Sequence, residues 1–205
     1  MQVTSQWSVV ETPYGISICV DGHVVVSFSE TSTVRLFTHE GVLQRSITVD
    51  QVVNLRHAVV LDTGQLVICH GDLQHRAGVS IVDADGHLLK TLPAEADPSQ
   101  PVWPTHDAGD EQGFRTHPAE DSSHLIWSTH VAVDERGFIY VSDYSGRRVA
   151  QLDSDLTYLG DIVGYEEGLR NPRNLCLDSS SRRMYVAQAN GSVVVFALHN
   201  LLPLY

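Results

Sequence analysis

The sequence predicts an all-β protein on the basis of its composition, its short alternating segments and an internal repeat. The chain has 205 residues, of which 42% are apolar, and this is enough to bury a substantial core in one domain. Short stretches in which apolar and polar residues alternate are separated by turns that contain Gly, Asp or Ser, as expected of half-buried strands. The clearest stretch is residues 130–152, with the sequence HVAVDERGFIYVSDYSGRRVAQL.

This stretch is one copy of a repeat. When it is aligned on its turn glycine, Gly137, three further segments match it: residues 15–37, 57–70 and 174–196. The equivalent positions in the four copies are Gly15, His57, His130 and Asn174. Two of the intervals between these positions are about 43 residues, and the third is longer because it contains an insert. The chain therefore consists largely of four related units.

Each unit is predicted to form four short strands. In the clearest copy they lie near 129–134, 138–143, 147–153 and 156–163. Four strands in a repeat of about 43 residues are typical of a β-propeller blade, and blades must stack because a lone blade cannot bury both of its faces. We therefore predict a β-propeller with about four blades, at residues 12–51, 52–91, 124–168 and 169–205.

The units resemble NHL repeats. The most diagnostic part is GFIYVSD followed by RRV in the third unit, and NPRNLCLDSSSRRMYVAQANGSVVVF and TPYGISICVDGHVVVSFSETSTVRLFTHEG match it in register. Where the third unit has Asp143, the other units depart from the family pattern with Phe28, His70 and Gln188. NHL propellers usually close with six blades, so the resemblance implies either part of a six-bladed propeller or a small closed one.

The first residues bear on how the ring closes. Residues 3–10, VTSQWSVV, precede the first unit and have two interpretations. In one, they form the outer strand of the fourth unit, whose own fourth strand is poor or absent, and so close a small ring. The alternative is that the chain is part of a longer propeller. An open blade edge would also permit self-association, because it presents unpaired backbone groups.

Residues 92–123 interrupt the repeat with a segment rich in Pro, Gly, Ser and acidic residues. A segment of this length without strand signals is usually either a functional loop or a disordered one. Its two aromatic residues, Trp103 and Phe114, are candidate anchors for a partner. A solvated acidic surface loop is the alternative.

One end of a propeller collects the starts of the inner strands, the turns between second and third strands and the connections between blades, around the mouth of the central channel. The candidate binding residues occupy these positions. They are His57, His70, Trp103, Phe114, His130, Asp143, Arg147, Arg148, Arg170, Arg173 and Asn174. These residues are therefore predicted to share one binding face.

The histidines of this set have two interpretations. His57 and His130 occupy the same position in adjacent units, so both are expected to line the channel and to hydrogen-bond to water or backbone. Together with His70 and Asp143 they are alternatively zinc ligands, as in the propeller lyases and lactone hydrolases to which the repeats are similar. The other two units lack a histidine at the equivalent position, and we expect no bound metal or other cofactor.

The charged residues favour a protein or peptide partner. The net charge of −12 disfavours nonspecific binding to nucleic acids and to anionic membranes. Arg147, Arg148, Arg170 and Arg173 are nevertheless predicted to form a local basic patch, and guanidinium groups suit carboxylates or phosphates. A protein or peptide is the expected partner, and the arginines are either ordinary surface residues or contacts to an acidic peptide or a phosphate. Single-stranded RNA, which some NHL propellers of tripartite-motif proteins bind, is the less favoured alternative.

The chain is expected to be cytoplasmic. Its three cysteines, Cys19, Cys69 and Cys176, are odd in number and lie in apolar segments, which fits reduced thiols better than disulfides. No apolar run approaches the roughly 18 residues of a membrane span. The first residues also lack the pattern of a secretory signal.

The resemblance to NHL repeats implies a non-catalytic interaction scaffold, similar to the C-terminal propeller of tripartite-motif proteins. That propeller selects partners while other domains transfer ubiquitin. The chain has no cysteine and histidine set of a RING or B-box domain, so ligase activity does not reside in it. The alternatives are an RNA-binding NHL propeller and a metal-dependent hydrolase or lyase of the six-bladed type.

Overall fold

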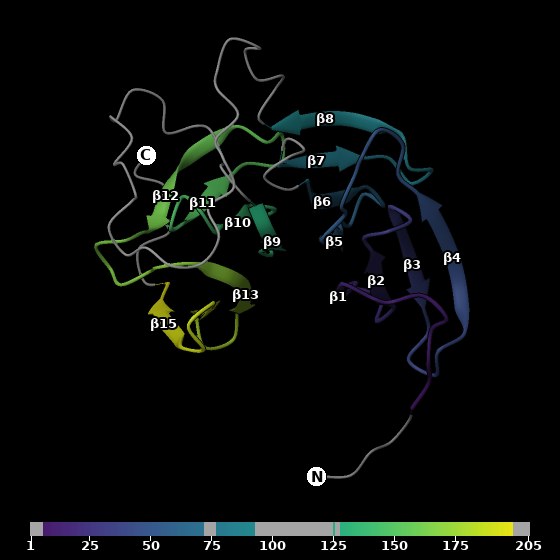
Figure 1. Cartoon of the computed structure of the whole chain (residues 1–205), viewed down its shortest axis with the longest axis horizontal. Helices are drawn as coiled ribbons and strands as arrows, with labels where there is room; N and C mark the ends of the chain where they lie inside the picture. Colours follow the sequence, from purple (N-terminus) through teal and green to yellow (C-terminus); the bar gives the residue numbers. More distant parts are fainter. Residues whose placement is uncertain (1–5, 72–76, 93–124, 126–127, 199–205) are drawn as a thin grey trace.

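The computed structural model describes residues 6–71, 77–92, 125 and 128–198, and its strands form four antiparallel sheets. Figure 1 shows these sheets as blades around a common centre, with the chain passing from blade one to blade four in sequence order. The fold is therefore a four-bladed β-propeller, and the prediction of an all-β propeller is confirmed. The described residues contain no helix that is long and apolar enough to cross a membrane.

The first strand of each blade is the innermost, and the later strands follow in order towards the outside. Blade one consists of β1 (Gly15–Ile18), β2 (Val24–Phe28), β3 (Thr33–Phe37) and β4 (Leu43–Thr48). Blade two consists of β5 (His57–Val60), β6 (Leu66–His70), β7 (Gly78–Val82) and β8 (Leu88–Leu92). Blade three consists of β9 (Ser128–Val133), β10 (Ile139–Asp143), β11 (Arg148–Leu152) and β12 (Tyr158–Val163). Blade four has three strands, β13 (Pro172–Asp178), β14 (Arg183–Gln188) and β15 (Val193–Ala197).

Acidic side chains and glycines build the turns between first and second strands. In blade three, Asp134 Oδ1 accepts hydrogen bonds from the backbone N–H groups of Arg136 and Phe138, at 3.0 and 2.9 Å. Gly137 follows with a φ of 83°, in the left-handed region where a side chain carries a steric penalty. The turn that reveals the repeat in the sequence is thus a local structure fixed by its own residues.

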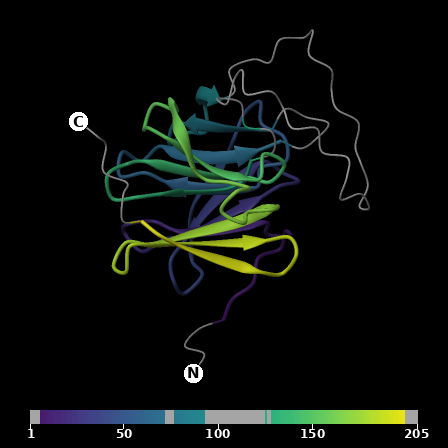
Figure 2. The same ribbon diagram turned by 90° about the vertical axis from the view of Figure 1, so that its left-hand side faces the viewer.

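Three apolar clusters hold the blades together face to face. Between blades one and two, for example, Val25 and Val34 pack with Ala58 and Ile68. Equivalent clusters join blades two and three and blades three and four. Figure 2 shows the blades nearly edge-on, with blade four in yellow as the lowest layer. Most of the core therefore lies between blades, as the stacking of repeat units requires.

The described part of the N-terminal segment, residues 6–10, has no strand pairing and lies against blade one. The indole of Trp7 is 4.9 Å from the ring of Phe37 in β3, and Val9 packs beside it. Residues 6–10 therefore do not form the closing strand of the first interpretation of residues 3–10, and residues 3–5 lie outside the described part. The indole instead covers apolar surface on the blade that follows it directly in sequence.

Blades one and four are the two ends of the array. The inner strands contact one another in the order β1, β5, β9 and β13, and the described residues give no comparable contact between β13 and β1. Blade four also ends at β15, which has a partner strand on one side only within the described chain. Each end blade consequently has one face that no other blade covers.

Candidate functional site

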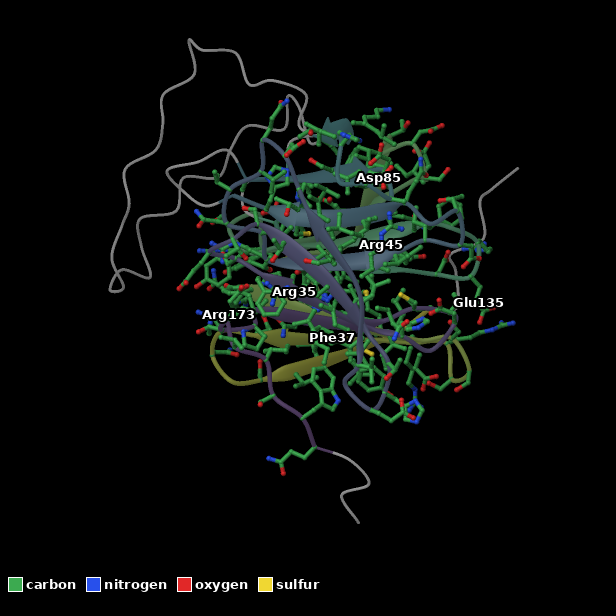
Figure 3. The ribbon with its side chains drawn as sticks, turned by 90° about the vertical axis from the view of Figure 1, so that its right-hand side faces the viewer. Arg35, Phe37, Arg45, Asp85, Glu135 and Arg173 are labelled. Atoms are coloured by element: carbon green, nitrogen blue, oxygen red, sulfur yellow. The ribbon has the colours of Figure 1, made fainter. Side chains whose placement is uncertain are left out.

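One end of the propeller, here called the mouth face, is made of the starts of the inner strands, the turns between second and third strands, and the connections between blades. Backbone hydrogen bonds join these segments. The N–H of Gly71 donates to the carbonyl of Val53 at 2.8 Å, and the N–H of Ala189 donates to the carbonyl of Asn171 at 3.0 Å. Figure 3 shows Arg173, from the mouth face, and Glu135, from a turn between first and second strands, at opposite sides of the molecule.

The two histidines predicted to line the channel meet near the centre of the propeller. The rings of His57 in β5 and His130 in β9 are stacked, with centroids 3.5 Å apart and an interplanar angle of 22°. The Nε2 atom of His57 lies 3.1 Å from the carbonyl oxygen of Ile16 in β1. His57 is 3% exposed. This pair therefore links the inner strands of blades one, two and three as an interior contact.

Burial determines the protonation of this pair. Loss of hydration lowers the pKa of His57 to about 4. Burial, together with the neighbouring His57, lowers the pKa of His130 to about 2. Both imidazoles are therefore neutral at pH 7, which permits them to stack. The Nδ1 atom of each ring is buried and has no hydrogen-bond partner among the described residues.

The stacked geometry does not suit joint coordination of one metal ion. The lone pairs of two nearly parallel rings lie in separate planes, so the nitrogens of His57 and His130 do not converge on one point. Among the residues that the structure describes, no three His, Cys, Asp or Glu side chains are close enough to hold an ion. The pair is a neutral packing contact in this geometry.

Equivalent polar residues at the ends of the second strands support the mouth face from beneath. In blade two, His70 is buried with its Nε2 atom 2.8 Å from Ser80 Oγ, and burial lowers its pKa to about 4. In blade four, Gln188 Oε1 accepts a hydrogen bond from the backbone N–H of Arg170 at 2.6 Å. Asp143 holds this position in blade three, where it is fully buried.

Asp143 and Arg148, both predicted as binding residues, form a buried ion pair. Asp143 accepts hydrogen bonds from the N–H of Gly146 at 3.0 Å and from Nε of Arg148 at 3.2 Å. Arg148 also reaches Asp161 at 3.2 Å, and its side chain is 11% exposed. Gly146 suits this turn because a Cβ there would lie 2.3 Å from Asp143 Oδ2. Asp143, Arg148 and Asp161 together therefore link β10, β11 and β12.

Arg170 and Arg173 are exposed on the mouth face and stack on tyrosines. The guanidinium of Arg170 lies 4.0 Å from the ring centre of Tyr165, and its Nη1 donates to the Tyr165 carbonyl at 3.0 Å. Arg147 lies 5.3 Å from the centre of the same ring. Arg173 lies 5.7 Å from the ring centre of Tyr144. Cation–π contacts of this kind favour fixed orientations of the guanidinium groups.

Sequence reasoning missed a further arginine–tyrosine pair. Arg56 lies 5.5 Å from the ring centre of Tyr14, and its Nη1 donates to the phenolic oxygen at 2.6 Å. Arg56 and Arg173 each directly precede equivalent repeat residues, His57 and Asn174. The alignment of the repeats therefore contained the signal, since it places both arginines at the same point of their blades.

Of the three remaining candidates, the structure describes one. Asn174 is exposed on β13. Trp103 and Phe114 lie in the insert, outside the described residues, so their role as anchors stays a prediction. Glu166 and Glu167 are exposed in the same connection as Tyr165 and Arg170, so the mouth face is of mixed charge.

Comparisons with known proteins identify the class as a β-propeller. No protein-family model matches the sequence, and no curated protein matches it. Among solved structures, the WD40 β-propeller domain of Doa1 is similar with a TM-score of 0.59 at 13% identity, covering 94% of this chain and 53% of that chain. A streptogramin B lyase structure has a TM-score of 0.53 at 15% identity, covering 94% of this chain and 57% of that chain.

A protein of unknown function from Bacteroides caccae is also similar, with a TM-score of 0.53 at 12% identity, covering 92% of this chain and 57% of that chain. At such identities the similarity shows the fold alone. This chain spans little more than half the length of these solved structures. Their group contains both a WD40 domain and a lyase, so fold similarity does not decide between binding and catalysis.

Proposed function

We propose that this chain is a non-catalytic protein-interaction propeller that binds an acidic peptide segment at its mouth face. The propeller fold, shared with a WD40 domain, supports a scaffold role in general terms. The observation that carries the proposal is the exposure of Arg170 and Arg173 on one face, each stacked on a tyrosine ring. A planar guanidinium held in a fixed orientation can bind a carboxylate through two parallel hydrogen bonds.

The charges around these arginines favour a short acidic peptide over RNA. RNA binding draws on a row of basic contacts to phosphates, and the net charge of this chain is −12. Glu166 and Glu167 are exposed in the same connection as Arg170, and their charges disfavour an extended phosphate backbone on this face. A peptide with two or three carboxylates needs only a small arginine cluster.

The NHL-like motifs extend this proposal. By resemblance to tripartite-motif NHL proteins, we propose that the chain serves as the substrate-recognition part of a cytoplasmic ubiquitin ligase whose transfer domains lie elsewhere. A metal-dependent hydrolase or lyase is less favoured. It would require converging ligands, and the described residues offer only the stacked pair of His57 and His130 near the channel.

A peptide-binding measurement tests the acidic-peptide proposal. Fluorescence anisotropy would compare a labelled peptide with three consecutive glutamates, its glutamine counterpart and a labelled single-stranded RNA oligonucleotide. The chain should prefer the glutamate peptide, and Arg170→Glu combined with Arg173→Glu should weaken its binding at least tenfold. Loss of a hydrogen bond to a charged group costs about 1.5–3 kcal/mol, which corresponds to this factor or more.

The matched control is Arg182→Glu combined with Arg183→Glu. These arginines are exposed at the other end of the propeller, so the control changes the net charge equally without touching the mouth face. Peptide binding should be unchanged in this control. An equal loss of peptide binding in both double variants would show that binding depends on overall charge and not on the mouth face. Tighter binding of the RNA than of the glutamate peptide would contradict the proposal and indicate a nucleic-acid ligand.

A further inference from the structure

The two end blades carry complementary packing faces that are independent of the mouth face. The leading face of a blade is defined here as the face that packs against the next blade in the chain, and the trailing face as the one that packs against the previous blade. On the leading faces of blades one to three, the second strands present Val25, Val67 and Tyr140, which are at most 1% exposed. The third strands present Val34, Val79 and Val149, which are 0% exposed.

Blade four presents the same positions without a cover. Strand register identifies the equivalent residues, because Val149 pairs with Ser142 in blade three as Val193 pairs with Ala187 in blade four. Val193 is 60% exposed and Val195 is 50% exposed. Cys176, on the same side of this sheet, is exposed as well. Blade four therefore has a leading face of the type that is buried in the three other blades.

Blade one presents the opposite, trailing face. Ala58, Val131 and Leu175 occupy the trailing faces of blades two to four and are 2%, 0% and 4% exposed. Their equivalent in blade one is Ile16, which pairs with Val26 and is 67% exposed. The neighbouring apolar residue on this side of the strand, Ile18, is 70% exposed.

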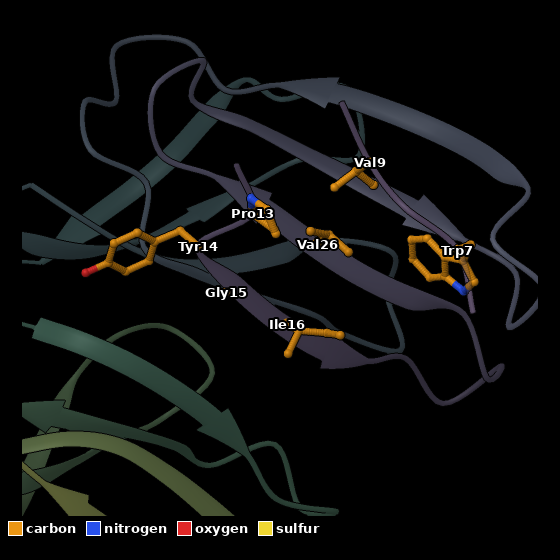
Figure 4. Close-up of a pocket in the computed structure, with 7 residues that line it drawn as sticks. All are labelled: Trp7, Val9, Pro13, Tyr14, Gly15, Ile16 and Val26. Atoms are coloured by element: carbon orange, nitrogen blue, oxygen red, sulfur yellow. The ribbon is translucent and has the colours of Figure 1, made fainter. Parts of the chain in front are cut away.

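A shallow apolar hollow lies beside Ile16. It has a volume of about 290 Å³, and its lining includes Trp7, Val9, Tyr14 and Val26. Figure 4 shows that Trp7 and Val9 cover the outer part of the blade, while Ile16 lies on the inner strand beside the hollow. The inner part of the trailing face thus remains open, with space for an apolar side chain.

We propose that the leading face of blade four packs against the trailing face of blade one in a second copy of this chain. The described part of one chain has one uncovered face of each kind, so two copies supply the complement for both. Such a contact is heterologous, and two of them close a ring of two chains. The lengths agree with this closure, because one chain covers 53% to 57% of the longer propellers and two chains therefore supply about the length of one.

Sedimentation velocity of the full chain tests this proposal through complementation. Val195→Asp removes the leading face of blade four, and Ile16→Asp removes the trailing face of blade one. The unaltered chain should sediment as two chains, and each variant alone as one chain. An equal mixture of the two variants should recover a two-chain species, because one variant keeps an intact leading face and the other keeps an intact trailing face.

Leu89→Asp is the matched control, since Leu89 is 53% exposed on β8, away from both end faces, and this variant should remain a two-chain species. The rate of maleimide labelling of the unaltered chain is a second measurement, and it does not depend on a variant. Cys176 is exposed whereas Cys19 and Cys69 are buried, so its labelling should slow at least tenfold as protein concentration rises. A one-chain species at all concentrations, a mixture that stays at one chain, or growth into longer oligomers would each overturn the two-chain ring.

Discussion

The buried histidines and the exposed arginines of the mouth face are neighbours in sequence with opposite environments. Arg56 directly precedes His57, and both belong to the segment that opens blade two. His57 is buried against His130, whereas Arg56 lies over the ring of Tyr14 on the mouth face. A shift of one residue at the start of an inner strand therefore moves a side chain from the interior to the surface.

This difference follows from the chemistry of the two side chains. An imidazole can lose its proton when it is buried, so its burial need not leave an unpaired charge in the interior. A guanidinium keeps its charge at any physiological pH, so an arginine is stable near the channel only where it reaches solvent, an aromatic ring or a carboxylate. Arg148 illustrates the last case, because its burial is compensated by Asp143 and Asp161.

Acidification should have the largest effect on stability, because it acts on the buried histidines. Unfolding restores an ordinary pKa of about 6.5 to each histidine, so the unfolded state binds more protons than the folded state below that pH. The free energy of unfolding should therefore fall as the pH drops from about 6.5 towards 4, by about 2 kcal/mol for each of His57 and His130 at pH 4.5. Urea unfolding at several pH values measures this loss.

His87 provides a control for the acid effect. It is exposed beside Asp83, whose hydrogen bond raises the pKa of His87, so its contribution to stability is present at low pH and is lost as the pH rises. A His57→Gln, His130→Gln double variant should reduce the acid-induced loss and leave the part that comes from buried His70, whereas His87→Gln should not reduce it. An unchanged slope in the double variant would assign the acid sensitivity to other groups.

Loss of the buried carboxylate should have the next largest effect. Asp143→Ala leaves the N–H of Gly146 without its side-chain acceptor and removes one of the two carboxylates beside Arg148, so the free energy of unfolding should fall by about 3 kcal/mol. Asp161→Asn alters only the more exposed end of the same network and should cost less than about 1 kcal/mol. Chemical denaturation compares the two variants, and equal losses would show that burial of Asp143 adds nothing.

The mouth-face arginines should have the smallest effect on stability. Arg170→Glu combined with Arg173→Glu should change the free energy of unfolding by no more than about 0.5 kcal/mol for each residue, because both side chains are exposed. The same variant is expected to lose peptide binding, so thermal unfolding and anisotropy should separate its folding from its function. A large loss of stability would mean that the tyrosine stacks hold the blades together.

The blade architecture was predictable because it depends on local signals. Period-two alternation, glycines such as Gly137 and acidic turn residues such as Asp134 specify strands and turns within about 40 residues of chain, and their recurrence reveals the repeat. The same alignment also located the starts of the inner strands, and with them the position shared by His57 and His130. These features require no knowledge of distant contacts.

Burial and pairing were decided only by the tertiary structure. The sequence placed Asp143, Arg148, Arg170 and Arg173 in one predicted set, but packing buries the first two as an ion pair and exposes the last two over tyrosines. It also left open whether residues 3–10 form a closing strand, and the structure places Trp7 against blade one instead. A repeat fixes which side of a sheet a residue faces, whereas its environment depends on what lies against that side, and this explains why equivalent valines are buried in blade three and exposed in blade four.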